Sequence, residues 1–216
     1  MTEPTELAGS EHTEVDPETE RLARGALPYL EASGWLNSRR LKMPVDAEER
    51  PLPWWTYPII DFLARRVRPD MRVFEFGSGN STLWWASRVE HVTAVEHHPR
   101  WAVRMAQAVP DNVSLLHVPL EPDGDYCRTS QRTGGRFDIV VVDGRDRVNC
   151  ARECLGSLKE DGVIVWDDSQ RRRYRPGFRF LGRRGFRQLE FHGHGPMDTL
   201  PWETSVFYRD VNCLGL

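Results

Sequence analysis

The chain has 216 residues, of which 39% are hydrophobic and 28% charged, and its formal net charge is -3. These values are ordinary for one globular domain with short extensions, and so small a net charge excludes a molecule that is electropositive overall. No apolar run approaches the roughly 20 residues of a membrane-spanning helix, and the N-terminus lacks the basic and apolar regions of a secretory signal. We therefore expect a cytoplasmic protein that binds no membrane and, by default, no nucleic acid.

The N-terminal segment is acidic, since its first 20 residues contain Asp and Glu but no Lys or Arg. Such a segment buries too little apolar surface to offset its ordering entropy, so residues 1–25 are predicted to be a disordered tail. Residues 26–53 mix helical and turn signals and are predicted to be a helical or irregular extension. The regular pattern begins at Trp54, and residues 54–216 are predicted to form the functional domain.

From residue 54 onward, helix and strand patterns alternate. Strands are predicted over 71–76, 91–95, 113–118, 137–142, 162–166, 186–191 and 204–208. Helices are predicted around 59–63 and over 81–89, 99–109, 146–158 and 170–184. Residues 119–136 contain several Pro and Gly and are predicted to be a long loop with at most a short helix.

This alternation predicts an α/β fold: a Rossmann-like, doubly wound, seven-stranded sheet with a terminal antiparallel strand pair. In open sheets of this kind, ligands bind beyond the carboxyl ends of the strands. Residues that directly follow each strand are therefore the candidates for chemistry.

The first predicted strand runs into a glycine-rich turn, Glu75-Phe-Gly77-Ser-Gly79, which a helix follows. Glycines let a ligand approach the backbone closely. A dinucleotide-binding turn has a third glycine, but Thr82 stands at that position, and the Gly-Lys-Ser/Thr of a P-loop is absent from the sequence. The acid before the turn suits a cationic ligand better than a pyrophosphate. Glu96 ends the second strand, where a carboxylate can accept both hydroxyl groups of a ribose.

Residues 54–210 resemble the class I S-adenosylmethionine-dependent methyltransferases. The stretch from Glu75 to Asn80 is similar to the first motif of that family, and Glu96 is similar to its ribose-binding acid. The resemblance implies S-adenosyl-L-methionine (SAM) as methyl donor, bound by Glu75, Gly77, Ser78, Gly79, Asn80, Ser81, Thr82, Glu96, His97 and Asp143. The alternative is a non-catalytic protein of Rossmann-like fold that binds another adenosine ligand.

Acidic residues follow two strands that a sheet of this kind places side by side. Asp143 follows strand 137–142, and Asp167 and Asp168 follow strand 162–166. Converging carboxylates repel one another unless a cation or hydrogen bonds compensate, and oxygen-rich sites suit Mg²⁺. The milder interpretation is that Asp143 belongs to a turn and that Asp167 or Asp168 caps the next helix.

This arrangement resembles the metal-dependent O-methyltransferases of the catechol and caffeoyl-coenzyme A type. The resemblance implies a Mg²⁺ ion held by Asp143, Asp167 and Asp168. Two positions depart from the pattern: Asp168 replaces an asparagine, and Asp146 stands where the family has a lysine that acts as base.

The residues predicted to act on the acceptor are Asp143, Asp168, Arg147 and His194. Arg147 could pair with Asp143 or clamp an anionic substrate, and His194 has a side chain that titrates near neutrality, as a general base requires. Eight arginines between Arg171 and Arg187 border this region; they indicate either a solvated helix face or an acidic acceptor.

The function predicted from the sequence is SAM-dependent methylation of a small-molecule acceptor, at oxygen and with Mg²⁺ assistance, and the arginines allow that acceptor to be anionic. The alternative within methyl transfer is a metal-independent N- or RNA methyltransferase. A homodimer is compatible with the sequence.

Overall fold

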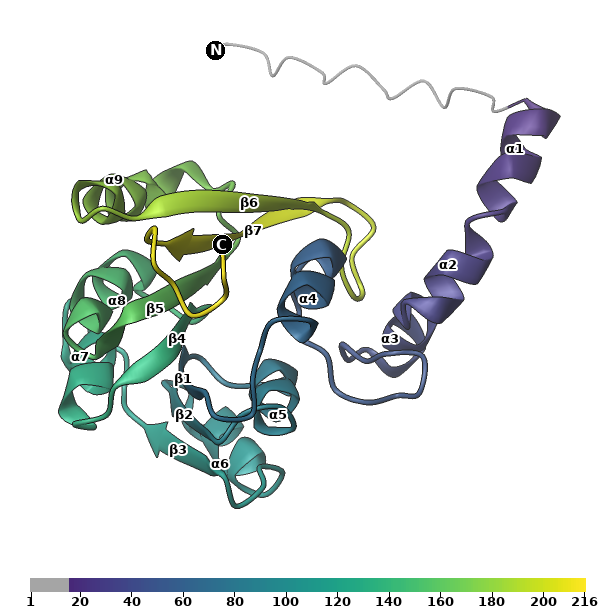
Figure 1. The fold of residues 1–216 in the computed structure, drawn as a ribbon. Coiled ribbons are helices and arrows are strands. Elements are labelled where there is room, and N and C mark those ends of the chain that lie inside the picture. The colour runs from purple at the N-terminus through teal and green to yellow at the C-terminus, as the bar shows by residue number, and fades with distance from the viewer. Residues whose placement is uncertain (1–15) are drawn as a thin grey trace, which may run out of the picture.

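The computed structural model describes residues 16–216 and contains one seven-stranded sheet (Figure 1). The strands are β1 (Arg72–Phe76), β2 (His91–Glu96), β3 (Val113–His117), β4 (Phe137–Val142), β5 (Leu158–Asp167), β6 (Arg187–Gly193) and β7 (Trp202–Tyr208). Their order in the sheet is β3-β2-β1-β4-β5-β7-β6. Strands β1 to β5 are parallel, and β7 pairs antiparallel with both β5 and β6. This confirms the predicted Rossmann-like sheet and its terminal antiparallel pair.

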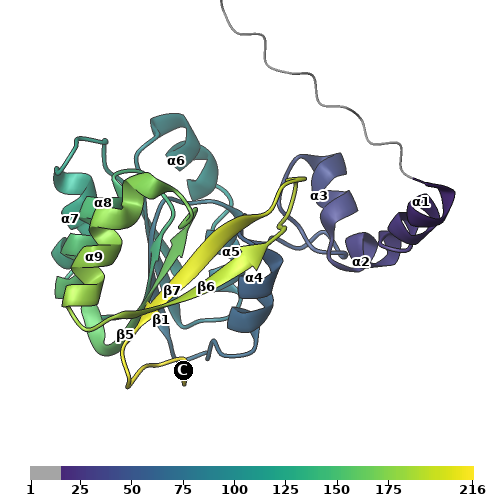
Figure 2. The same ribbon diagram turned by 90° about the horizontal axis from the view of Figure 1, so that it is seen from above.

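Helices cover both faces of the sheet (Figure 2). One face carries α4 (Tyr57–Ala64) and α5 (Asn80–Ala86), whereas the other carries α7 (Asp125–Arg132), α8 (Arg147–Glu153) and α9 (Arg175–Arg183). Helix α6 (Pro99–Ala106) joins β2 to β3 and packs against both strands. Within residues 16–216, no helix combines the length and apolarity needed to cross a membrane.

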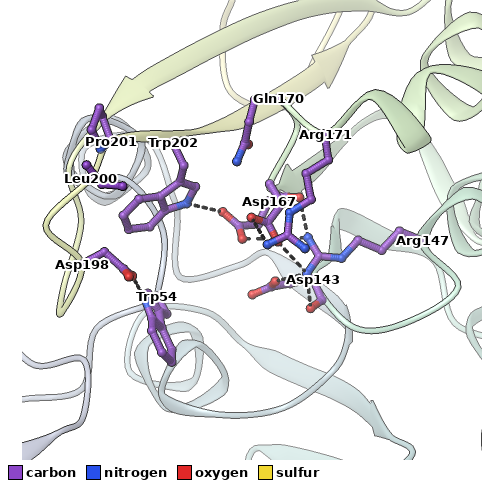
Figure 3. Close-up of a pocket in the computed structure, with 11 residues that line it drawn as sticks. Trp54, Asp143, Arg147, Asp167, Gln170, Arg171, Asp198, Leu200, Pro201 and Trp202 are labelled. Atoms are coloured by element: carbon purple, nitrogen blue, oxygen red, sulfur yellow. Dashed lines mark hydrogen bonds and ion pairs between the residues drawn. The ribbon is translucent and has the colours of Figure 1, made fainter. Parts of the chain in front are cut away.

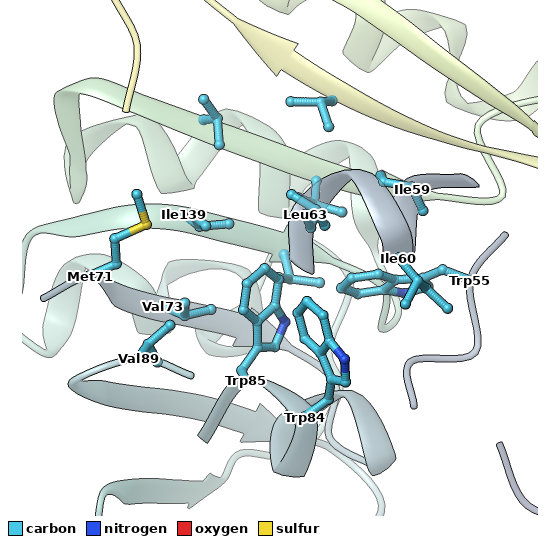
Figure 4. Packing of buried hydrophobic residues seen from close by; sticks show 14 of the residues in the cluster. Trp55, Ile59, Ile60, Leu63, Met71, Val73, Trp84, Trp85, Val89 and Ile139 are labelled. Atoms are coloured by element: carbon cyan, nitrogen blue, oxygen red, sulfur yellow. The ribbon is translucent and has the colours of Figure 1, made fainter. Parts of the chain in front are cut away.

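Because both faces of the sheet are covered, its central strands are mostly apolar, and every residue of β4 is buried. Alternate side chains of a strand point to opposite faces. On the α4 and α5 face, Trp55, Trp84 and Trp85 pack with Val73 and Ile139 (Figure 4). A second cluster on the other face includes Phe74, Phe76, Val140 and Trp166, among others. These two cores hold the carboxyl ends of β1, β2, β4 and β5 in fixed positions.

Part of the predicted disordered tail has helical structure. Residues 17–24 form helix α1 (Pro17–Arg24), whose Pro17 suits a first turn and whose Glu18 and Glu20 lie at the positive end of the helix dipole. Arg24 also pairs with Glu20 at 2.9 Å, one turn apart. The rest of the predicted tail, residues 1–15, lies outside the described residues.

Two more helices fill the predicted extension, namely α2 (Leu27–Ala32) and α3 (Trp35–Leu41). Helix α2 buries no residue, and α1 and α2 together extend away from the sheet (Figures 1 and 2). Helix α3, in contrast, packs close to the domain: the Trp35 indole donates a hydrogen bond of 2.9 Å to the backbone oxygen of Asp198.

Other boundaries differ from the sequence prediction. Residues 125–132 of the predicted loop form α7, which buries Tyr126, Cys127, Thr129 and Ser130. The predicted helix 146–158 ends at Glu153, where a 3₁₀ turn, η1 (Cys154–Gly156), leads into a longer β5. A second 3₁₀ turn, η2 (Arg172–Tyr174), precedes α9, which begins at Arg175 because Pro176 suits the first turn of a helix.

Candidate active site

The turns that follow β1 and β4 pack backbone against backbone. Gly77 has a φ of 103°, a value that favours glycine. At Gly144, a Cβ atom would lie 2.1 Å from the Tyr126 hydroxyl and 3.0 Å from the Gly77 nitrogen. Only a residue without a side chain fits there. The two glycines therefore let the turns after β1 and β4 approach each other closely, which leaves room for a ligand above them.

Glu75 is a buried carboxylate at the end of β1, with 1% of its surface exposed. The hydroxyl groups of Ser81 and Thr82, in the first turn of α5, donate hydrogen bonds to its two oxygens. The pKa of Glu75 is raised to about 8, mainly by burial and in part by the charges of Asp143 and Glu96, although the two hydrogen bonds oppose this shift. A positively charged ligand beside Glu75 would favour its ionised form.

A cavity of about 330 Å³, here called the cofactor cavity, opens above these strand ends. Its lining residues are Glu75, Gly77, Ser78, Ser81, Glu96, His97, Asp143, Gly144, Arg145, Arg147, Asp168 and Arg171. Most of the residues predicted to bind the cofactor therefore line this cavity.

Three predicted cofactor residues do not line this cavity. The Thr82 hydroxyl instead accepts a hydrogen bond of 3.0 Å from the Gly79 nitrogen, which caps α5. The Asn80 side chain donates to the backbone oxygen of Pro44 at 2.6 Å, so it ties α5 to the N-terminal extension. Gly79 contributes its backbone to the same helix start.

Glu96 ends β2 with its carboxylate in the cofactor cavity. One oxygen accepts a hydrogen bond of 2.8 Å from the His98 nitrogen, and the other accepts one of 3.1 Å from the Ser78 hydroxyl. Next to it, His97 Nδ1 is buried and forms no hydrogen bond, although it lies 3.0 Å from a Glu96 oxygen. A carboxylate at the end of the second strand is able to accept hydrogen bonds from the hydroxyl groups of a ribose.

Arg147 lies among the three predicted metal ligands (Figure 3). Its guanidinium contacts carboxylate oxygens of Asp143 at 3.0 Å, Asp168 at 3.5 Å and Asp167 at 3.9 Å. It also donates hydrogen bonds to the backbone oxygens of Asp143 and Asp167, and so links the ends of β4 and β5. The guanidinium of Arg147 thus provides a positive charge at the place where the sequence predicted a metal ion.

Other side chains donate hydrogen bonds to two of these carboxylates. Trp55 donates to Asp143 at 2.9 Å, whereas Trp202 and Thr204 donate to one oxygen of Asp167 at 3.1 and 2.7 Å. Burial raises the pKa of Asp167 well above its ordinary range, and the neighbouring Asp143 and Asp168 add to this shift.

These acids do not fit the predicted Mg²⁺ ion. Magnesium requires a nearly octahedral set of oxygen ligands, but here the oxygens face an arginine and two indole donors. Within residues 16–216, no group of three or more His, Cys, Asp or Glu side chains is arranged to hold a metal.

A second cavity of about 590 Å³, here called the acceptor cavity, adjoins the first (Figure 3). One side is formed by Trp54, Leu200, Pro201 and Trp202, the other by charged and polar residues that include Gln170. The two cavities share four lining residues, which are Asp143, Arg147, Asp168 and Arg171.

The predicted catalytic residues fall into two groups. Asp143, Asp168 and Arg147 meet at the wall between the cavities. His194 is exposed and lines neither cavity; its backbone oxygen accepts a hydrogen bond of 2.7 Å from the Tyr57 nitrogen. The structure therefore does not bring His194 to the site.

Sequence reasoning missed three contributors to the site. Trp55 was not among the predicted site residues, but its indole nitrogen donates a hydrogen bond to Asp143. Arg171 pairs with Asp168 at 2.7 Å, and it was only one of eight arginines in the sequence. The close turn at Gly144 could have been predicted from the sequence, because an Asp-Gly pair directly after a buried strand is typical of such a turn.

Comparisons with known proteins agree with this geometry. A family model described as a methyltransferase domain matches residues 74–169. The chain is similar to a solved methyltransferase-like protein from Silicibacter pomeroyi, with 27% identity and a TM-score of 0.52 over 73% of this chain and 89% of that one. A search of curated proteins finds no significant match.

Two more distant structures share the fold. One is precorrin-6Y C5,15-methyltransferase from Geobacter metallireducens, with 15% identity and a TM-score of 0.54 over 69% of this chain and 86% of that one. The other is fibrillarin from Aeropyrum pernix, solved with natively bound SAM, with 16% identity and a TM-score of 0.51 over 66% of this chain and 68% of that one. The domain match shows that residues 74–169 are similar to a methyltransferase domain, and the solved structures show that the chain shares the Rossmann-like fold of class I, SAM-dependent methyltransferases.

Proposed function

We propose that this protein transfers the methyl group of SAM to a small acceptor molecule without the help of a metal ion. The observation that carries the proposal is the wall shared by the two cavities, formed by Asp143, Arg147, Asp168 and Arg171. A donor in one cavity and an acceptor in the other would meet at this wall, where proximity and alignment supply much of the rate enhancement of methyl transfer.

In the cofactor cavity, Glu96 would hold the ribose hydroxyls and Glu75 would face the positively charged end of the ligand. When bound, SAM supplies a methyl group on a positively charged sulfur. The SAM found in the Aeropyrum fibrillarin structure supports this ligand by analogy of fold.

Asp168 is the residue best placed to take a proton from the acceptor. Its φ of 59° lies in the left-handed region, a strain that costs on the order of 1–3 kcal/mol and often marks functional positions. Arg171 fixes one carboxylate oxygen at 2.7 Å, and the other lies 3.5 Å from Arg147. As the carbon–sulfur bond breaks and the new bond to the acceptor forms, the acceptor proton would pass to Asp168 and then to water.

We propose a hydroxyl oxygen as the atom that is methylated. A hydroxyl group loses one proton on methylation, and one carboxylate at the shared wall, that of Asp168, can accept it. Trp54 and Trp202, on the opposite side of the acceptor cavity, suit a flat apolar part of the same molecule.

A transfer assay with methyl-labelled SAM and fractionated metabolite extract tests this proposal. We expect labelled product, equal in amount with and without EDTA, and a loss of about 100-fold or more in Asp168→Asn. The matched control is Asp61→Asn, which changes an exposed aspartate on α4 that pairs with Arg65. Loss of activity in EDTA would disprove metal independence, and the absence of labelled product from every pool would disprove catalysis.

A further inference from the structure

A third cavity, of about 320 Å³, lies between the start of α8 and the segment that leads into α9. We call it the arginine groove; its lining residues are Gly144, Arg145, Asp146, Arg147, Val148, Arg171, Arg173 and Tyr174. It shares Gly144, Arg145, Arg147 and Arg171 with the cofactor cavity. A group bound in the groove would therefore lie directly beside the methyl donor.

The charges in the groove are only partly balanced. Arg147 and Arg171 face carboxylates of Asp143 and Asp168. In contrast, Arg145 and Arg173 form no ion pair with any residue that the structure describes. Arg145 is exposed at the point where the arginine groove and the cofactor cavity meet.

The one acid in the groove is already engaged by other groups. Both oxygens of Asp146 accept hydrogen bonds from the Asn149 amide, at 3.0 and 3.2 Å. One of them also accepts a bond of 2.9 Å from the Asp123 nitrogen. Asp146 thus holds the turn before α8 and forms no ion pair with Arg145 or Arg173.

Arg173 is held at the groove by an aromatic ring. Its guanidinium donates a hydrogen bond of 3.0 Å to the Tyr174 hydroxyl and lies over that ring, 4.9 Å from its centroid. Tyr174 is itself buried, with 8% of its surface exposed, and has Arg147 at 5.5 Å from the same ring centroid. These contacts position a full positive charge without neutralising it.

The surrounding surface adds to the positive potential. Residues 169–189 include eight arginines and no Asp or Glu, although the whole chain has a net charge of -3. Arg175, Arg179 and Arg183 lie exposed on α9, beyond the groove. Such a field attracts anions toward the groove and repels cations.

We infer that the arginine groove binds a phosphate group carried by the methyl acceptor, a conclusion that rests on the proposed function. Two unpaired guanidinium groups provide two positive charges, which match the charge of a phosphate monoester near neutral pH. Guanidinium groups also present paired N–H donors whose geometry suits phosphate oxygens. A phosphate within a nucleic-acid chain carries one negative charge, so a small phosphorylated acceptor matches the groove better.

Calorimetric titration of the full chain with inorganic phosphate tests this inference, at constant ionic strength and in the presence of saturating S-adenosylhomocysteine. We expect saturable binding of phosphate, weakened about tenfold or more in Arg173→Gln and abolished in the double variant Arg145→Gln/Arg173→Gln. Arg173 does not line the cofactor cavity, so Arg173→Gln should still bind S-adenosylhomocysteine. The matched control, Arg179→Gln/Arg183→Gln, removes two charges outside the groove, so it should lower phosphate affinity by about twofold at most, through the weaker field alone.

Three results would overturn the inference. The first is no phosphate binding by a wild-type protein that still binds S-adenosylhomocysteine, which would leave the proposed function intact. The second is mutual exclusion of phosphate and S-adenosylhomocysteine, since the groove would then belong to the cofactor site. The third is displacement of phosphate by a short oligouridylate whose affinity depends on Arg179 and Arg183, which would indicate an RNA surface. Failure to bind S-adenosylhomocysteine at all would instead contradict the proposed function.

Discussion

At the scale of single residues, Glu75 has the clearest physical consequence. It is buried and lines the cofactor cavity, and burial raises its pKa to about 8. In the unfolded chain a glutamate titrates near its ordinary pKa of about 4.3. Between these two values the folded state binds more protons than the unfolded state, so the contribution of Glu75 to stability declines as the pH rises from about 5 to 8.

Replacing Glu75 by Gln should remove this pH dependence. We expect the free energy of unfolding of the ligand-free wild type to fall, relative to that of Glu75→Gln, by about 1.4 kcal/mol per pH unit across this window. Urea unfolding of both proteins at pH 5.5, 6.5 and 7.5 measures the difference. Parallel pH profiles would show that Glu75 is ionised in the folded protein.

Gly144 allows a second test at this scale. A Cβ atom there would lie 2.1 Å from the Tyr126 hydroxyl, so Gly144→Ala should lower stability by about 1–3 kcal/mol and weaken binding of S-adenosylhomocysteine. Gly182, in α9, has no atom within 4 Å of an added Cβ. Gly182→Ala should therefore be neutral or stabilising by up to about 1 kcal/mol. Equal thermal stability of the two variants would argue against the close glycine contact.

The residues that sequence could predict share one property: each lies at the carboxyl end of a strand or directly after it. Glu75, Glu96 and Asp143 were predicted for that reason, and all three line the cofactor cavity. Trp55 and Arg171 reach the site from segments without such a marker. Their role depends on side-chain direction, which a single sequence does not specify.

At the scale of elements, the strands were easier to predict than the helices. The pattern predicted β4 over the residues that the structure assigns to it, because a strand covered on both faces is continuously apolar. The short helix allowed within residues 119–136 could not be located, because the buried face of α7 combines Tyr126 with small and polar residues, which gives no apolar periodicity. Helix α1 was missed because it is stabilised by dipole and ion-pair effects instead of burial.

Helix α3 supports one wall of the acceptor cavity. Trp35 and Arg39 donate hydrogen bonds, each of 2.9 Å, to the backbone oxygens of Asp198 and Met197. These residues belong to the loop before β7, and Asp198 and Leu200 from this loop line the cavity. Through α3, the N-terminal extension thus supports the loop that lines the acceptor cavity.

Trp35→Phe should loosen this loop selectively. Loss of the indole donor removes about 1 kcal/mol of local stability, so backbone amides of residues 197–200 should exchange hydrogen several-fold faster. Trp101→Phe is the matched control, because the Trp101 indole donates to Ser78 on the cofactor side and should leave the loop unchanged. Unaltered exchange in Trp35→Phe would show that α3 does not hold the loop.

At the scale of the whole molecule, the sheet order brings the ends of β1, β2, β4 and β5 to one edge. The alternation of strands and helices predicted the doubly wound sheet and its terminal antiparallel pair. The arrangement of side chains at this edge was predicted less well. The sequence showed three carboxylates, but it did not show that Arg147 would lie among them. Charge balance inside a pocket depends on tertiary packing, which residue types alone do not determine.

The most direct test of SAM as the ligand is calorimetric titration of the purified protein with S-adenosylhomocysteine and, separately, with NAD. We predict saturable binding of S-adenosylhomocysteine, no binding of NAD, and a loss of affinity of about tenfold or more in Glu96→Ala, which removes the carboxylate expected to hold the ribose. Binding of NAD alone, or an unchanged affinity for S-adenosylhomocysteine in Glu96→Ala, would contradict the assignment of the cofactor cavity.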